Sequence, residues 1–89
     1  MKKIILYTKK GCPYCLETKK LLKCLNISFS DYELDPNNPK YNSLKEQTFK
    51  QFNHYSFPII IADKDLIGGY TELYRLYKNN ELFPFLTSS

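Results

Sequence analysis

The chain is short and weakly basic, which limits the classes of protein it can belong to. It has 89 residues and a formal net charge of +4, so we expect one small domain over 1–89 with a single core. No apolar run approaches the ~20 residues of a membrane span, and the dispersed lysines form no basic helix, so neither a membrane protein nor a nucleic-acid-binding protein is expected. Three cysteines and the absence of a secretory apolar segment after MKKIILY predict a cytoplasmic protein without a disulfide framework.

The first predicted elements are a strand and a helix. KIILY is a short apolar run that ends before Lys9-Lys10-Gly11, and it indicates a buried strand. Pro13 suits the first position of a helix, which places Cys12 at the N-cap. An apolar stripe at helical spacing then predicts an amphipathic helix packed on a sheet. The stripe contains Tyr14, Cys15, Thr18, Leu21, Leu22 and Leu25.

A second strand and a second helix follow. The segment ISFSDYEL at 27–34 predicts a strand, which the turn-forming DPNNP ends. Apolar residues at helical spacing in KYNSLKEQTFKQFN predict the helix. Its start has two candidates, the pair Asn38-Pro39 and a capping box from Ser43 to Glu46.

The remaining elements complete a mixed sheet. Pro58 leads the apolar strand IIIAD, and the turn at 63–65 into LIGG predicts a hairpin. A last helix follows with Thr71 as its N-cap, and Pro84 excludes a long regular helix through the tail. This order predicts an α/β fold, β-α-β-α-β-β-α, in which helices flank both faces of a mixed four-stranded sheet.

The cysteine pair is consistent with a metal site, a structural role or a redox couple. Structural zinc takes four ligands, and beyond Cys12 and Cys15 the chain offers one cysteine and one histidine. Cys24 lies about 13 Å along the helix from Cys15, too far to join that site or to form a disulfide with it. We therefore expect no metal, and interpret Cys24 as a small buried or half-buried apolar residue and His54 as a loop residue.

Redox chemistry fits the position of the pair best. A helix N-terminus and adjacent lysines favour the thiolate, which is the nucleophilic form of cysteine, so Cys12 is predicted to be the nucleophile. Cys15 lies on the buried side of the stripe and is predicted to be the resolving thiol.

Three motifs in order along the chain resemble those of the dithiol glutaredoxins. They are GCPYC after a strand, FP before an apolar strand, and IGGYTE at the start of the last helix. Thioredoxins typically carry Gly-Pro between their cysteines, and monothiol relatives replace the second cysteine with serine. The resemblance implies a thioredoxin fold, a cis peptide bond before Pro58, and glutathione as co-substrate without a tightly bound cofactor.

The resemblance also implies a glutathione site. In it Lys9 attracts the glycyl carboxylate, the Phe57 backbone pairs with the cysteinyl part, and Glu72 takes the ammonium group. Each residue also has a structural interpretation, such as a solvated Lys9, a capping Thr71 or a turn at Gly68-Gly69. The implied glutathione-binding residues are Lys9, Tyr14, Phe57, Pro58, Gly69, Tyr70, Thr71 and Glu72.

The function predicted on this basis is that of a monomeric, cytoplasmic, glutathione-dependent thiol–disulfide oxidoreductase. Its expected partners are glutathione and disulfide-bearing or glutathionylated proteins, with ribonucleotide reductase among the candidates. One alternative is an iron–sulfur carrier in which Cys12 and glutathione ligate a shared cluster, which the rigid Pro13 disfavours. The other is a redoxin recharged by thioredoxin reductase, against which the YTE motif counts.

Overall fold

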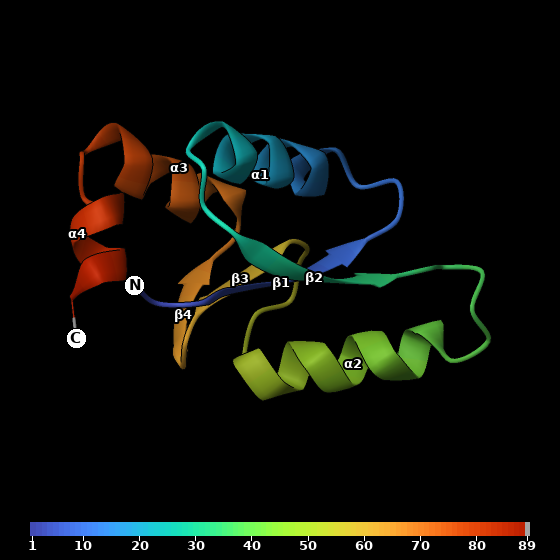
Figure 1. Cartoon of the computed structure of the whole chain (residues 1–89). Helices are drawn as coiled ribbons and strands as arrows, with labels where there is room; N and C mark the ends of the chain where they lie inside the picture. The colour runs from blue at the N-terminus through green and yellow to red at the C-terminus, as the bar shows by residue number, and fades with distance from the viewer. Residues whose placement is uncertain (89) are drawn as a thin grey trace.

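The computed structural model describes residues 1–88 and shows a four-stranded sheet with helices on both faces (Figure 1). The predicted order of strands and helices is confirmed, and a short fourth helix is added at the end. The strands are β1 (Ile4–Lys9), β2 (Phe29–Leu34), β3 (Ile59–Ala62) and β4 (Asp65–Gly68). The helices are α1 (Pro13–Cys24), α2 (Tyr41–Phe52), α3 (Tyr70–Lys78) and α4 (Leu82–Thr87).

The sheet has the strand order β2-β1-β3-β4 and is mixed, as predicted. β1 and β2 are parallel because α1 carries the chain across one face between them, with Ile4 opposite Phe29. β3 runs antiparallel to both of its neighbours, β1 and β4. Every residue of β3 is buried, as expected for a central strand covered on both faces.

The main core lies on one face of the sheet, beneath α1, α3 and α4 (Figure 1). Alternate residues of β1 and β3 point to this face, where they meet the apolar sides of the three helices. This arrangement places the N-terminal ends of α1 and α3 on the same face. The core residues are Ile4, Leu6, Leu22, Ile27, Ile60, Ala62, Leu73, Leu82 and Leu86.

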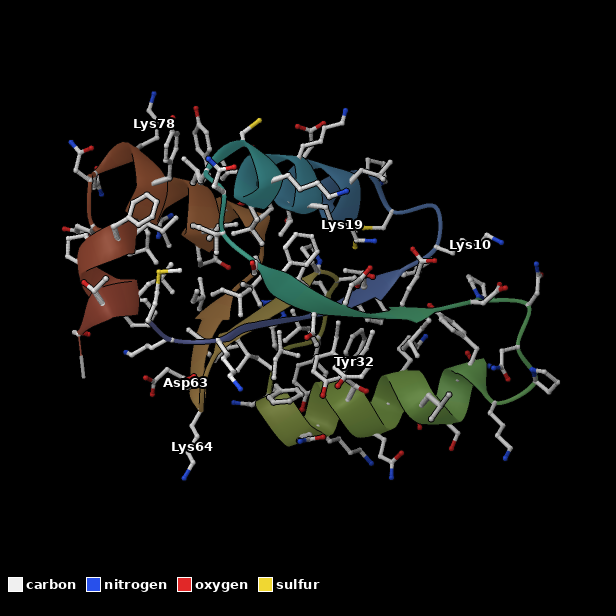
Figure 2. The ribbon with its side chains drawn as sticks, viewed as in Figure 1. Lys10, Lys19, Tyr32, Asp63, Lys64 and Lys78 are labelled. Atoms are coloured by element: carbon white, nitrogen blue, oxygen red, sulfur yellow. The ribbon has the colours of Figure 1, made fainter. Side chains whose placement is uncertain are left out.

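The other face is covered by α2 alone, and aromatic contacts hold it. Tyr7 of β1 contacts Phe52 of α2 with ring centroids 5.2 Å apart, and it stacks on Tyr32 at 5.3 Å. Figure 2 shows Tyr32 between β2 and α2. Phe49 contacts Phe57 in the following loop at 5.0 Å. No residue of α2 is buried, whereas α1, α3 and α4 each bury at least one residue against the opposite face.

The observed start of α2 decides between the two helix starts that the sequence allowed, at Asn38-Pro39 and at Ser43. The helix begins at Tyr41 with Lys40 at its N-cap, and the Asn38 side-chain oxygen accepts the Lys40 backbone N–H at 2.9 Å. The start near Asn38-Pro39 is therefore correct and the capping box at Ser43 is wrong. The reason is that the turn preceding Tyr41 already satisfies the first backbone amide.

The tail forms α4, which the sequence did not predict as a helix. Pro84 is its third residue, where the backbone N–H would have no partner within the helix, so proline is tolerated there. The helix has six residues, consistent with the prediction that no long helix crosses Pro84. Leu86 is fully buried, and its carbonyl accepts the Lys2 backbone N–H at 2.7 Å, which ties the two ends of the chain together. Within residues 1–88, the helices are all too short or too polar to span a lipid bilayer.

Candidate active site

Cys12 occupies the N-cap of α1, as predicted. Gly11 has a φ of +82°, which turns the chain from β1 into the helix. The Cys12 backbone N–H donates to the Lys9 carbonyl at 3.2 Å, and the Cys15 backbone N–H donates to Cys12 Sγ at 3.3 Å. The sulfur therefore takes the role of a capping side chain at the N-terminal end of the helix.

Cys15 lies one turn further along α1 and is only 2% exposed. Burial raises the pKa of the Cys15 thiol to about 12, and the hydrogen bond and charge of Cys12 add to this increase. A backbone hydrogen bond from Lys9 and the charge of Lys19 act in the opposite direction. The pair thus consists of a partly exposed sulfur at the helix end and a buried neutral thiol behind it, with no disulfide between them.

Lys19 belongs to a polar network between α1 and β2 that the sequence analysis did not single out. Its ammonium group pairs with Asp31 and Glu33, and the buried Thr8 hydroxyl donates to Asp31 at 2.7 Å. Burial opposes the charge of Lys19, but the two carboxylates outweigh this effect and raise its pKa. Figure 2 shows Lys19 on the side of α1 that faces β2. The network fixes the helix that carries both active-site cysteines.

A cavity of about 340 Å³ lies between the start of α1 and the start of α3 and collects most of the predicted binding residues. Neither cysteine lines it, but Tyr14, which stands between them in the chain, does. The Phe57–Pro58 peptide bond at its wall is cis, which confirms the expectation from the resemblance. The side chain of Lys9 is exposed and does not line the cavity, although its backbone contacts both cysteines. The lining residues are Tyr14, His54, Ser56, Phe57, Pro58, Gly69, Tyr70, Thr71 and Glu72.

Two of these lining residues, His54 and Ser56, were missed in the sequence. His54 Nδ1 lies 3.0 Å from the Ser56 carbonyl oxygen, and its ring lies next to Gly69. The interpretation of His54 as a plain loop residue is therefore incomplete. Their position just before Phe57-Pro58 was the available signal, because residues that precede a chain segment lining a site tend to share its wall.

The start of α3 differs from the prediction. Gly69 is the N-cap, and Glu72 Oε1 accepts its backbone N–H at 2.7 Å. Thr71 is therefore not the cap, because the longer Glu72 side chain reaches back to this amide. Glycine has no side chain to return the hydrogen bond, so this is half of a capping box. The backbone amides of the first turn of α3 stay available at the cavity, where they suit an anion.

Two expectations about residues of α1, one for Cys24 and one for Tyr14, were wrong. Cys24 is exposed, neither buried nor half-buried, because it ends the helix on the side away from Leu22. Tyr14 was placed on the apolar stripe but is 62% exposed, since the stripe passes beyond the edge of the sheet at this end. Within residues 1–88, the His, Cys, Asp and Glu side chains form no group of three or more that is arranged to hold a metal ion.

Comparison with known proteins identifies the family. A glutaredoxin family model matches residues 4–67. Glutaredoxin 3 of Escherichia coli K12 is 35% identical over 86 residues, which cover 97% of this chain and 99% of that protein. The solution structure of a Brucella melitensis glutaredoxin, at 29% identity, gives a TM-score of 0.78 over 97% of this chain and 89% of that one. A crystal structure of a buckwheat glutaredoxin–glutathione complex, at 21% identity, shares the fold, with a TM-score of 0.84 over 97% of this chain and 77% of that one. This chain belongs to the glutaredoxin family of thiol–disulfide oxidoreductases.

Proposed function

We propose that this glutaredoxin uses Cys12 as its nucleophile and Cys15 as its resolving thiol, with glutathione as the reductant. The observation that carries the proposal is the contrast between the two sulfurs. Cys12 Sγ accepts a backbone hydrogen bond at a helix N-terminus, whereas the Cys15 thiol is buried and held neutral. Cys12 therefore suits the attack on a substrate disulfide, and Cys15 suits the later resolution of the mixed disulfide.

The proposed reaction transfers two electrons from glutathione to the substrate disulfide. The Cys12 thiolate attacks a substrate disulfide, forms a mixed disulfide with one sulfur, and releases the other as a thiolate. Cys15 then displaces the substrate and leaves an oxidised Cys12–Cys15 pair, which two glutathione molecules reduce while they become glutathione disulfide. With a glutathionylated substrate, Cys12 takes the glutathionyl group, and one further glutathione releases it as glutathione disulfide.

The cavity between the starts of α1 and α3 supports a site for glutathione. Its γ-glutamyl carboxylate suits the backbone amides at the start of α3, and its cysteinyl backbone suits the chain at Phe57. One oxygen of Glu72 caps the helix, and the carboxylate retains further acceptor sites for the ammonium group. Lys9 ends β1 just before the cysteine loop, and its exposed charge attracts the glycyl carboxylate. The reaction belongs in the cytoplasm, where the glutathione pool is reducing.

Cysteine variants test these roles. Cys15→Ser should keep the reduction of a small glutathione mixed disulfide, because glutathione itself can release Cys12. It should lose nearly all reduction of an intramolecular protein disulfide, because Cys15 is the thiol held next to the tethered intermediate. Cys12→Ser should abolish both activities. The measurement is glutathione oxidation coupled to glutathione reductase, with one substrate of each kind.

Cys24→Ser is the matched control, because Cys24 is an exposed cysteine at the far end of the same helix. It should spare both activities. Loss of both activities in Cys15→Ser, or of either in folded Cys24→Ser, would contradict the assignment. Turnover that required thioredoxin reductase in place of glutathione would contradict the choice of reductant. Visible absorption by anaerobically prepared protein would instead support the iron–sulfur alternative.

A further inference from the structure

Four tyrosines form a continuous row on the outer surface of α1 and α3. Tyr14 stacks on Tyr70 with ring centroids 6.0 Å apart, Tyr70 on Tyr74 at 5.8 Å, and Tyr74 contacts Tyr77 at 6.1 Å. We call this row, Tyr14, Tyr70, Tyr74 and Tyr77, the tyrosine ladder. Tyr14 is 62% exposed, and Tyr74 and Tyr77 are each 39% exposed, so the ladder presents aromatic rings to solvent.

The ladder is not part of the core. On α3 its members stand at positions i, i+4 and i+7, which form one stripe, while the neighbouring stripe places Leu73 in the core. Burial, together with the nearby Glu17 and Tyr74, raises the pKa of Tyr70, which is consistent with its place between α1 and α3. Lys78 lies 5.6 Å from the Tyr74 ring and points away from the sheet (Figure 2). Contiguous exposed aromatic rings of this kind are typical of interaction surfaces.

The ladder starts in the active site and extends beyond the reach of glutathione. Tyr14 and Tyr70 line the cavity between the starts of α1 and α3, but Tyr74 and Tyr77 do not. The helix rises about 10 Å between Tyr70 and Tyr77, which equals the full length of an extended tripeptide, about 10 Å. The sulfur of glutathione is on its middle residue, so only part of this length extends to either side of Cys12. A glutathione molecule bound there therefore leaves Tyr74 and Tyr77 uncovered.

The outer end of the ladder opens into a second cavity. Its volume is about 150 Å³, and its lining is Tyr77, Asn80, Leu82 and Phe83. A cavity of about this volume with apolar walls accepts a benzene ring. Phe83 is also substantially exposed, so apolar surface continues from the ladder onto α4. The row thus joins the reactive sulfur to a hollow of a size that suits one large apolar side chain.

We propose that the tyrosine ladder is a docking surface for the polypeptide that flanks the reactive cysteine of a protein substrate. The cavity beside Tyr77 receives an apolar, preferably aromatic, side chain of that polypeptide. Three ladder steps of close to 6 Å correspond to five or six extended residues at about 3.3 Å each. The preferred substrate therefore carries this side chain about five or six residues from its cysteine. This inference rests on the proposed function, because it assigns the substrate class to the same Cys12.

Synthetic peptides of about ten residues test the inference. Each has one glutathionylated cysteine and, six positions away on either side, a phenylalanine or a serine at otherwise identical sequence. The wild-type protein should show a kcat/KM about tenfold higher for the better phenylalanine peptide than for its serine counterpart. The measurement is glutathione oxidation coupled to glutathione reductase, with a glutathione–cysteamine mixed disulfide as the small reference substrate.

Substitution of the outer ladder should remove this preference. The double variant Tyr74→Gln/Tyr77→Gln keeps good helix formers on α3, and its activity on the small disulfide, expected within about twofold of wild type, reports that it folds. Tyr41→Gln is the matched control, because Tyr41 starts α2 on the opposite face of the sheet (Figure 1). It should retain the preference for phenylalanine.

The outcomes separate this inference from the proposed function. Two results would overturn the docking surface alone. In one, the wild-type protein reduces the small disulfide but shows no preference between the peptides. In the other, the double variant keeps the preference. Equal loss of the preference in Tyr41→Gln would also overturn the docking surface. A concentration-dependent dimer of the wild type that the double variant abolishes would assign the ladder to self-association instead. Wild-type protein inactive on the small disulfide would overturn the proposed function itself.

Discussion

The buried Cys15 thiol couples the stability of the fold to alkaline pH. Its pKa is raised to about 12 in the folded protein, against about 8.5 for a free cysteine. Between these values the unfolded chain has released a proton that the folded chain still holds, so the free energy of unfolding falls as pH rises. Stability is complete below about pH 8.5 and is lost through this window, by up to about 1.4 kcal/mol per pH unit.

The variant Cys15→Ser isolates this contribution. Serine does not ionise here, so the free energy of unfolding of the reduced variant should fall less steeply above about pH 9 than that of the reduced wild type. Urea titrations at a series of alkaline pH values measure both slopes, and the tyrosines and lysines that titrate in the same range are common to the two proteins. Parallel curves would show that the Cys15 thiol ionises as easily in the folded chain as in the unfolded one.

The sequence predicted the positions of Cys12 and Cys15 better than that of Cys24. The first two depend on local geometry, since Pro13 fixes the helix start and a cysteine three residues beyond the N-cap must return to the buried side. Cys24 stands at the margin of the apolar stripe and at the end of its helix. At that position, the exposure of a side chain depends on how far the sheet extends beneath the helix. The spacing of apolar residues along the helix does not predict this extent.

At the scale of elements, the junction of β4 and α3 depends on Gly68. Gly68 has a φ of +123°, and a Cβ at this position would lie 2.6 Å from Glu72 Oε1. That oxygen is held by its hydrogen bond to the Gly69 N–H, so it is not free to move aside without loss of the cap. Gly68→Ala should therefore lower the free energy of unfolding by about 1–3 kcal/mol through backbone strain and loss of the Glu72 cap.

Gly69→Ala is the control for this prediction. At Gly69 the φ is −100° and the nearest atom to an added Cβ lies 3.5 Å away, so this substitution should change stability by less than Gly68→Ala. Chemical denaturation of both variants measures the difference. A larger loss for Gly69→Ala than for Gly68→Ala would contradict the account of this junction.

The elements themselves were predictable, whereas their ends and the site walls were not. Strands and helices follow from periodicity, and the turn residues between them are strong local signals. The N-cap of α3 was misplaced at Thr71 because Glu72, at the third helical position, accepts the Gly69 N–H and lets the helix begin two residues earlier, with Gly69 as its cap. His54 and Ser56 join the cavity only because the loop before Pro58 folds against the start of α3, a tertiary contact with no periodic signature.

For the whole molecule, the two faces of the sheet differ in packing. The face under α1, α3 and α4 holds the contiguous core, whereas α2 has no fully buried residue and contacts the sheet through aromatic rings such as Tyr7 and Phe52. Regions with few buried apolar contacts open at a lower free energy than the core. The backbone amides of α2 should thus exchange their hydrogens at least about tenfold faster than those of α1.

The same asymmetry should connect α2 to the glutathione site. Phe57, at the cavity wall, contacts Phe49 of α2 with ring centroids 5.0 Å apart, so a ligand that orders the chain at Phe57 also supports the C-terminal half of the helix. Saturating S-methylglutathione, which cannot form a disulfide, should therefore slow exchange in the second half of α2, and leave the first half and the solvent-facing end of α4 unchanged. Hydrogen exchange followed by mass spectrometry measures this directly. Slowing confined to α3, with α2 unaffected, would show that the Phe49–Phe57 contact does not transmit the effect of binding.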